Sequence, residues 1–157
     1  MKNGLDMNRL IDNNTEIFND TIPAKEKNVK VVFNCSGHEF YKIKVDSDRF
    51  NNLIGNNEPR CDYAIVKVSR GIELLIELKG QDVQRACEQL QATKRLLLNN
   101  HDNVFGAIAF RSNPAPTKLQ ISLKGIKDNA HFKGVFYHKN KLELIYIPDD
   151  NTIKKTN

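Results

Sequence analysis

The chain has 157 residues, of which 39% are hydrophobic and 27% are charged, and its formal net charge is +5. This length and composition predict one compact domain with its own core. No apolar run reaches the roughly 20 residues that a membrane-spanning helix needs, and the N-terminus lacks the apolar stretch of a signal peptide, so we expect a cytoplasmic protein without membrane contact. From Thr117 onward there are eight lysines and four acidic residues. This basic part is either an ordinary solvated surface or a surface that binds nucleic-acid phosphates.

The first half of the chain is expected to hold one helix and four strands. A weak apolar stripe predicts a helix over about 6–19, and Pro23 closes that segment. The stretch "NVKVVFNCSGHEFYKIKV" predicts two strands around a hairpin turn at 36–37. A polar loop, "DSDRFNNLIGNNEPR", follows. The apolar stretches "CDYAIVKVS" and "IELLIELK" then predict a second hairpin, which turns at 70–71.

The second half is expected to alternate helices and strands. "DVQRACEQLQATKRLLL" predicts a helix with Asp82 as its N-cap, and "NVFGAIAFR" predicts a strand that is buried on both faces. "SNPAPTKLQISLKGIKDN" suits a strand or a helix, and its Pro-Thr entry favours the helix. "HFKGVFYHKNKLELIYI" predicts a closing hairpin that turns at 139–140, before a frayed polar tail beyond Pro148.

These elements predict an α/β fold, with a mixed α+β sheet and helices on its faces. We expect one domain, with a core over about 6–111, a basic C-terminal extension over 112–148 and a polar tail over 149–157. The three cysteines lie far apart, which favours buried free thiols over a zinc site. The four histidines share no metal-ligand spacing, and no phosphate-binding glycine loop is present.

Charged residues at the end of an otherwise apolar strand are the strongest functional signal. In "IELLIELKG", Glu77 and Lys79 are two positions apart, so their side chains share a sheet face. A tight hairpin at 70–71 brings Asp62 near position 79, and therefore near Glu77. Two carboxylates and a lysine are then expected to converge at one edge of the sheet. Carboxylate oxygens suit Mg²⁺ or Mn²⁺, and the backbone carbonyl of Leu78 is a further expected ligand. The alternative interpretation is a simple ion pair between Glu77 and Lys79 at a solvent-exposed strand end.

Asp62 followed by Glu77-Leu78-Lys79, on two strands and before a helix, resembles the motif of the PD-(D/E)XK nuclease superfamily. "RCDYAIV", "IELLIELKG" and "ACEQL" are also similar to segments of small uncharacterised bacterial members. The resemblance implies a restriction-endonuclease-like core of helix, three strands, helix and strand. It also implies that Asp62 and Glu77 bind Mg²⁺ or Mn²⁺ and that Lys79 assists the attack of water on a phosphodiester.

The same resemblance suggests further residues. Asp46, at a strand end, is the first candidate for an additional acidic ligand, and Gln81 and Gln89 are candidates for polar groups beside the metal. The sequence departs from the usual pattern because "EPRCD" places two residues between the proline and the acid. A turn aspartate and a partly exposed glutamine are the plain alternatives for Asp46 and Gln89.

The expected function is that of a metal-dependent endonuclease, a hydrolase of phosphodiester bonds with DNA as the expected substrate, in genome defence, repair or mobile-element biology. Arg111, Lys118 and Lys124 are the expected nucleic-acid contacts, and a homodimer or a partner protein is a further expectation. The alternative from another class is a non-catalytic nucleic-acid-binding or assembly module on the same fold.

Overall fold

The computed structural model describes residues 5–79, 82–98, 103–112 and 116–157. These residues form a mixed α+β fold with two mixed sheets and three α-helices. The six-stranded sheet has the order β10-β9-β7-β6-β5-β2. Its strands are β2 (Glu16–Phe18), β5 (Phe40–Lys44), β6 (Tyr63–Lys67), β7 (Glu73–Lys79), β9 (Val104–Phe110) and β10 (Gly134–Lys139).

The smaller sheet has four strands in the order β12-β11-β4-β3. Its strands are β3 (Thr21–Glu26), β4 (Val29–Asn34), β11 (Lys141–Ile147) and β12 (Thr152–Lys155). A short parallel pair joins β1 (Leu5–Asp6) to β8 (Leu97–Leu98). The helices are α1 (Asp48–Leu53), α2 (Val83–Leu96) and α3 (Pro116–Ala130), with a 3₁₀ turn, η1, over Met7–Leu10.

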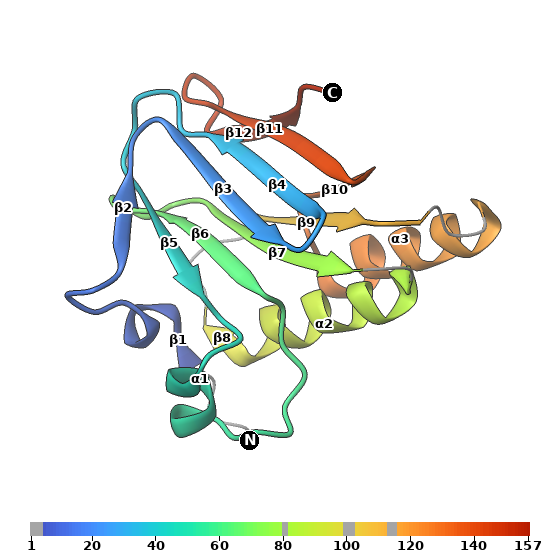
Figure 1. Cartoon of the computed structure of the whole chain (residues 1–157), viewed down its shortest axis with the longest axis horizontal. Helices are drawn as coiled ribbons and strands as arrows, with labels where there is room; N and C mark the ends of the chain where they lie inside the picture. The colour runs from blue at the N-terminus through green and yellow to red at the C-terminus, as the bar shows by residue number, and fades with distance from the viewer. Residues whose placement is uncertain (1–4, 80–81, 99–102, 113–115) are drawn as a thin grey trace.

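The fold has three layers, with the large sheet in the middle (Figure 1). The four-stranded sheet covers one face, and α2 and α3 cover the other. Alternate residues of β7 therefore enter two different cores, because successive side chains of a strand point to opposite faces. Leu75 packs with the helices, whereas Leu74 and Ile76 pack with the smaller sheet. Within the described residues, no helix is long and apolar enough to cross a membrane.

The central elements confirm the sequence predictions. β6 and β7 form an antiparallel pair, and Arg70 and Gly71 take the positive φ angles, 71° and 95°, that the connecting turn requires. Asp82 caps α2 by accepting a hydrogen bond from the Arg85 backbone at 3.0 Å. β9 is buried along its whole length and runs parallel to β7. The ambiguous segment after 112 is helical, as α3, and the three cysteines are free and buried.

The helix predicted over 6–19 is wrong. The described part of this segment forms the end of β1, the 3₁₀ turn η1 and strand β2. Asp12 closes a local turn instead of continuing a helix, because its carboxylate accepts the Asn14 N–H at 2.8 Å and its own N–H donates to Thr15 Oγ1 at 2.9 Å. Short polar side chains that bond to nearby backbone in this way compete with helix formation.

Two predicted hairpins are also wrong, although both turns exist. β4 pairs with β3 and β11, whereas β5 pairs with β6 and β2, so the turn at 36–37 carries the chain from one sheet to the other. The turn at Asn140 does the same, because β10 pairs with β9 and β11 pairs with β4. Asn140 joins the two sheets there, since its N–H donates to Phe110 O and its carbonyl accepts from Lys30 N, both at 2.8 Å.

Two polar segments are more ordered than predicted. The expected loop before Asp62 contains α1, whose N-cap Ser47 accepts the Phe50 N–H at 3.3 Å. The expected frayed tail forms β12, with Ile153 buried in the core between the sheets. The Asn157 side chain then bonds to the backbone of β11, which holds the end of the chain in place.

Candidate metal site at the edge of the large sheet

Asp62 and Glu77 are brought together by the pairing of β6 with β7. Tyr63 lies opposite Ile76 in this pair, so one further step along the register places Asp62 opposite Glu77. The Asp62 N–H donates to Ile76 O at 3.0 Å, and Asp62 Oδ2 accepts the Leu78 N–H at 2.8 Å. Residues opposite each other in an antiparallel pair have Cα atoms about 5 Å apart. The two carboxyl groups are therefore close neighbours on the sheet face that the helices cover.

This register differs from the predicted one by two residues. A tight turn at 70–71 would have placed Asp62 opposite Lys79. Instead, Lys67 N donates to Ile72 O at 3.3 Å, so the loop between the strands is wider than a two-residue turn. The predicted convergence still occurs, because a shift by an even number of residues keeps each side chain on its face of the sheet.

Glu77 is a buried carboxylate with little hydrogen bonding. Its side chain is 0% exposed, and Lys79 Nζ lies 2.8 Å from its Oε2. Apart from Lys79 and the Asp62 carboxyl group, neither carboxylate oxygen has a hydrogen-bond partner among the described residues. Burial, and then the nearby charge of Asp62, raises the pKa of Glu77 to about 8. Such a carboxyl group is poorly satisfied when it ionises, which favours binding of a further cation.

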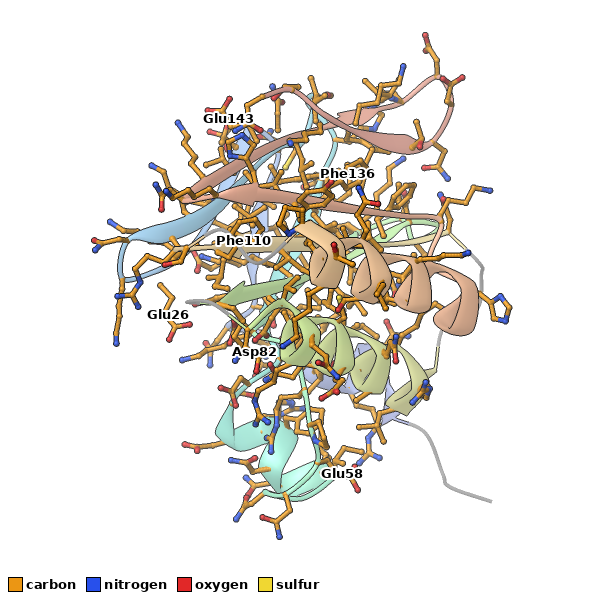
Figure 2. The ribbon with its side chains drawn as sticks, turned by 90° about the vertical axis from the view of Figure 1, so that its right-hand side faces the viewer. Glu26, Glu58, Asp82, Phe110, Phe136 and Glu143 are labelled. Carbon is orange, nitrogen blue, oxygen red and sulfur yellow. The ribbon has the colours of Figure 1, made fainter. Side chains whose placement is uncertain are left out.

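Besides Glu77, Asp62 has a second acidic neighbour, which the sequence did not indicate. Burial is the main cause that raises the pKa of Asp62, and the charge of Glu26 adds to it. Glu26 ends β3 in the smaller sheet, and Figure 2 shows it near the tip of β7. Sequence reasoning missed Glu26 because it depends on how the two sheets stack. Its position just before the predicted strand that begins at Asn28 gave no sign of this contact.

Helix α2 holds the segment that leads into Asp62. Thr93 Oγ1 accepts the Cys61 N–H at 2.7 Å, and Gln89 Nε2 donates to Arg60 O at 3.2 Å. Thr93 is fully buried, and its hydroxyl also donates to Gln89 O at 2.8 Å. These bonds fix the backbone immediately before Asp62. Thr93 is a positioning residue that sequence reasoning missed, although a threonine on the apolar stripe of α2 was a visible signal.

Asp46 and Gln89 lie beside this site and line a neighbouring cleft. The Asp46 N–H donates to Asp62 O at 3.3 Å, whereas its exposed carboxylate lies 3.9 Å from Arg60 Nε. Both residues line a cleft of about 300 Å³ between α2 and the loop at 56–60. Gln89 Oε1 is buried and lacks a hydrogen-bond partner within the described part of the chain. Gln81 lies outside the described residues.

Of the predicted nucleic-acid contacts, Arg111 is the one that lies at the site. Its backbone N–H donates to Lys79 O at 3.1 Å, and its side chain is exposed. Lys118 and Lys124 are both exposed on α3. Six residues of helix separate them by about 9 Å along the axis, so Lys118 is nearer the start of α3 and Lys124 lies further from it.

The carboxylates at this site fit a hard divalent cation that takes only a few of its ligands from the protein. Among the described residues, no group of three or more His, Cys, Asp or Glu side chains is arranged to hold a metal ion. Mg²⁺ nevertheless often binds through one or two carboxylates, with water and substrate phosphate completing its ligands. The buried carboxylate oxygens of Glu77, together with those of the neighbouring Asp62, are the kind of donors such an ion uses.

Comparisons of the chain with protein-family models, with curated proteins and with solved structures found no match.

Proposed function

We propose that the chain is a metal-dependent nuclease that hydrolyses phosphodiester bonds, with DNA as the expected substrate. The observation that carries this proposal is the buried, poorly hydrogen-bonded carboxylate of Glu77, opposite Asp62 and 2.8 Å from the amino group of Lys79. Two carboxylates and a lysine at the rim of a sheet are the groups that such a hydrolysis uses.

The arrangement of the elements supports the same proposal. The antiparallel strands β5, β6 and β7, then α2, then β9 parallel to β7, follow the order expected for a restriction-endonuclease-like core. The first helix of that order has no counterpart among the described residues, where β2 occupies the edge beside β5. We therefore include membership of the PD-(D/E)XK superfamily in the proposal, on the strength of the central strands and the motif.

Each residue has a distinct proposed role. Asp62 and Glu77 would hold the metal ion, with the Leu78 carbonyl as a further donor. When bound, a divalent ion supplies a more acidic water and stabilises negative charge on the phosphate. Lys79 would orient the attacking water and offset charge in the transition state. The Lys79 side chain is 26% exposed and would be partly available to substrate, whereas the Glu77 side chain is fully buried. Arg111 would contact an adjacent phosphate.

A non-catalytic nucleic-acid-binding module is the second candidate. The observation that favours it is the same 2.8 Å ion pair, because Lys79 neutralises Glu77 without any metal. In that case the basic residues would bind phosphates, and their affinity would fall with salt but would not depend on a divalent ion.

A cleavage assay distinguishes these functions. The purified chain would be incubated with plasmid, linear and branched DNA in Mg²⁺, Mn²⁺ or EDTA, beside Glu77→Ala. Glu143→Ala is a matched control, because Glu143 also pairs with a lysine two positions away at 2.8 Å, but on the exposed smaller sheet (Figure 2). The proposal expects metal-dependent cleavage that Glu77→Ala abolishes and Glu143→Ala retains. Equal cleavage by both variants would refute the mechanism.

A further inference from the structure

A second cavity lies at the edge strand β10, at the same end of the parallel strands β7, β9 and β10 as the candidate metal site. It measures about 460 Å³, within the range of small-molecule pockets. It lies between β10 and the beginning of α3, beside Lys155 of the smaller sheet. Its lining residues are Phe110, Pro116, Leu119, Tyr137, His138, Lys139 and Lys155.

The strand register connects this cavity to Lys79. Lys79 lies opposite Phe110 in the parallel pair of β7 and β9, and Phe110 lies opposite Lys139 in the pair of β9 and β10. Adjacent strands are about 4.8 Å apart, so the backbones at Lys79 and Lys139 are about 10 Å apart. Figure 2 shows Phe110 close to α3, on this side of the large sheet. A ligand that reaches from one lysine to the other would therefore enter both sites.

The lining combines an accessible aromatic ring with positive charge. The Tyr137 side chain is 37% exposed, which is unusual for a large apolar residue of this fold. Lys155 Nζ lies 5.7 Å from the centre of its ring, and Lys139 borders the same cavity. Among the described residues, none that lines the cavity carries a carboxylate. The cavity thus suits a ligand with a flat aromatic part and an adjacent negative charge.

An unpaired nucleotide has this chemistry. Its base can stack on an aromatic side chain, while its phosphate accepts hydrogen bonds from lysines. A base inside a duplex cannot enter such a cavity, because both of its faces are already stacked. α3 begins at Pro116 in the cavity wall, and the positive end of a helix dipole also favours a phosphate.

We propose that the cavity between β10 and α3 binds an unpaired nucleobase, which stacks on Tyr137 while Lys139 and Lys155 hold the adjacent phosphate. This proposal rests on the proposed function, in that it takes nucleic acid as the ligand, and it narrows the substrate to strands with an unpaired nucleotide near the cleavage point. Single strands, flaps and junctions are such substrates, whereas blunt duplexes are not.

The test measures binding without cleavage. Fluorescence anisotropy in EDTA would compare a labelled oligothymidine, its RNA counterpart and a blunt duplex hairpin, each with wild-type protein, Tyr137→Ala and Tyr137→Phe. We expect tighter binding of the single strands than of the hairpin. Tyr137→Ala should weaken single-strand binding about 10-fold, which is the typical loss of one stacked base, while hairpin binding stays unchanged. Tyr137→Phe keeps the ring and should bind as the wild type does.

Two further readouts keep the test decisive. Lys155→Gln should also weaken single-strand binding and should reduce its dependence on salt, because one phosphate contact is lost. Thermal melting shows whether each variant is folded. The proposal would be overturned if the wild-type protein bound the hairpin and the single strands with equal affinity. It would also be overturned if Tyr137→Ala and Lys155→Gln were both folded and bound single strands as tightly as the wild type does. If Tyr137-dependent binding is found but wild-type protein cleaves nothing in Mg²⁺ or Mn²⁺, the base site stands and the nuclease proposal fails.

Discussion

Asp62 and Glu77 lie opposite each other across β6 and β7, with both carboxyl groups on the helix-covered face of the sheet, where Glu77 is buried and Asp62 is half-buried. Burial raises the pKa of both groups, and the charge of Asp62 raises the pKa of Glu77 further, whereas the hydrogen bond between the two carboxyl groups lowers the pKa of Asp62. The pair is therefore costly to the free protein at neutral pH. A divalent ion bound between the two carboxylates would remove this free-energy cost. The site can therefore be tested by measuring the free energy of unfolding as well as by measuring activity.

The first prediction concerns pH and the free energy of unfolding without metal. Because the pKa of Glu77 is raised from 4.5 to about 8, the folded state keeps a proton between these values that the unfolded state has lost. The stabilising effect is complete below the unfolded pKa and is lost as the pH rises through the folded pKa. Stability should fall between about pH 5 and pH 8, by at most about 1.4 kcal/mol per pH unit for this group.

Urea unfolding of the metal-free protein across this pH range measures the slope. Glu77→Gln cannot ionise at this position, so its slope should be flatter and it should be the more stable protein at pH 8. Glu143→Gln is the matched control, because the charge of Lys141 lowers the pKa of the exposed Glu143. It should keep the wild-type slope. A slope equally steep in Glu77→Gln would mean that another group causes it.

The second prediction concerns metal binding. Mn²⁺ or Mg²⁺ should raise the melting temperature of the wild-type protein, and more at pH 8 than at pH 5, because the metal binds the ionised carboxylates. Asp62→Asn should lose most of this shift, since one ligand charge is gone. Calorimetry with Mn²⁺ checks the same point directly. A shift of equal size in Asp62→Asn would place the ion elsewhere.

The third prediction separates the lysine from the metal ligands. The hydrogen bond from Lys79, and then its charge, lowers the pKa of Glu77, so Lys79→Met should move the onset of metal binding to higher pH. Cleavage should fall by about 100-fold or more at a saturating metal concentration, because the group that orients water and offsets charge is missing. Lys79→Arg should restore the pH dependence of metal binding but little of the cleavage, because the guanidinium differs in shape and hydration. Full cleavage by Lys79→Met would assign Lys79 to the ion pair alone.

The sequence predicted the central part of the fold well because its signals there are local. Apolar β6 and β7, the turn at Arg70-Gly71 and the capped helix α2 need no partner to be recognised. Which of the two sheets a strand joins depends on contacts far away in the sequence. Both of the wrongly predicted hairpins are places where the chain passes from one sheet to the other. The same limit explains the candidate site. Asp62, Glu77 and Lys79 were found on neighbouring strands, whereas Glu26 was missed because it comes from the other sheet.

Arg60 and Cys61, the two residues between Pro59 and Asp62, both have structural roles, and the last prediction concerns Arg60. The Arg60 side chain is 9% exposed. Its guanidinium lies 4.3 Å from the Phe50 ring centre and donates to the carbonyls of Gly55, Asn56 and Glu58. Its neighbour Cys61 is buried in the helix-side core. Arg60 thus holds the loop over 55–58 against the segment that positions Asp62. Losing several charged hydrogen bonds to backbone should make Arg60→Ala less stable by roughly 2–4 kcal/mol.

Arg49→Ala is the matched control, because the side chain of the exposed Arg49 donates through Nε to Arg9 O at 2.6 Å and forms a 4.0 Å ion pair with Asp12. It should cost under about 1 kcal/mol. Urea unfolding measures both variants, and Mn²⁺ calorimetry of Arg60→Ala below its unfolding range tests the link to the site. If Arg60 positions Asp62 through the loop, the folded variant should bind Mn²⁺ more weakly. Unchanged Mn²⁺ affinity beside the expected loss of stability would confine Arg60 to holding the loop.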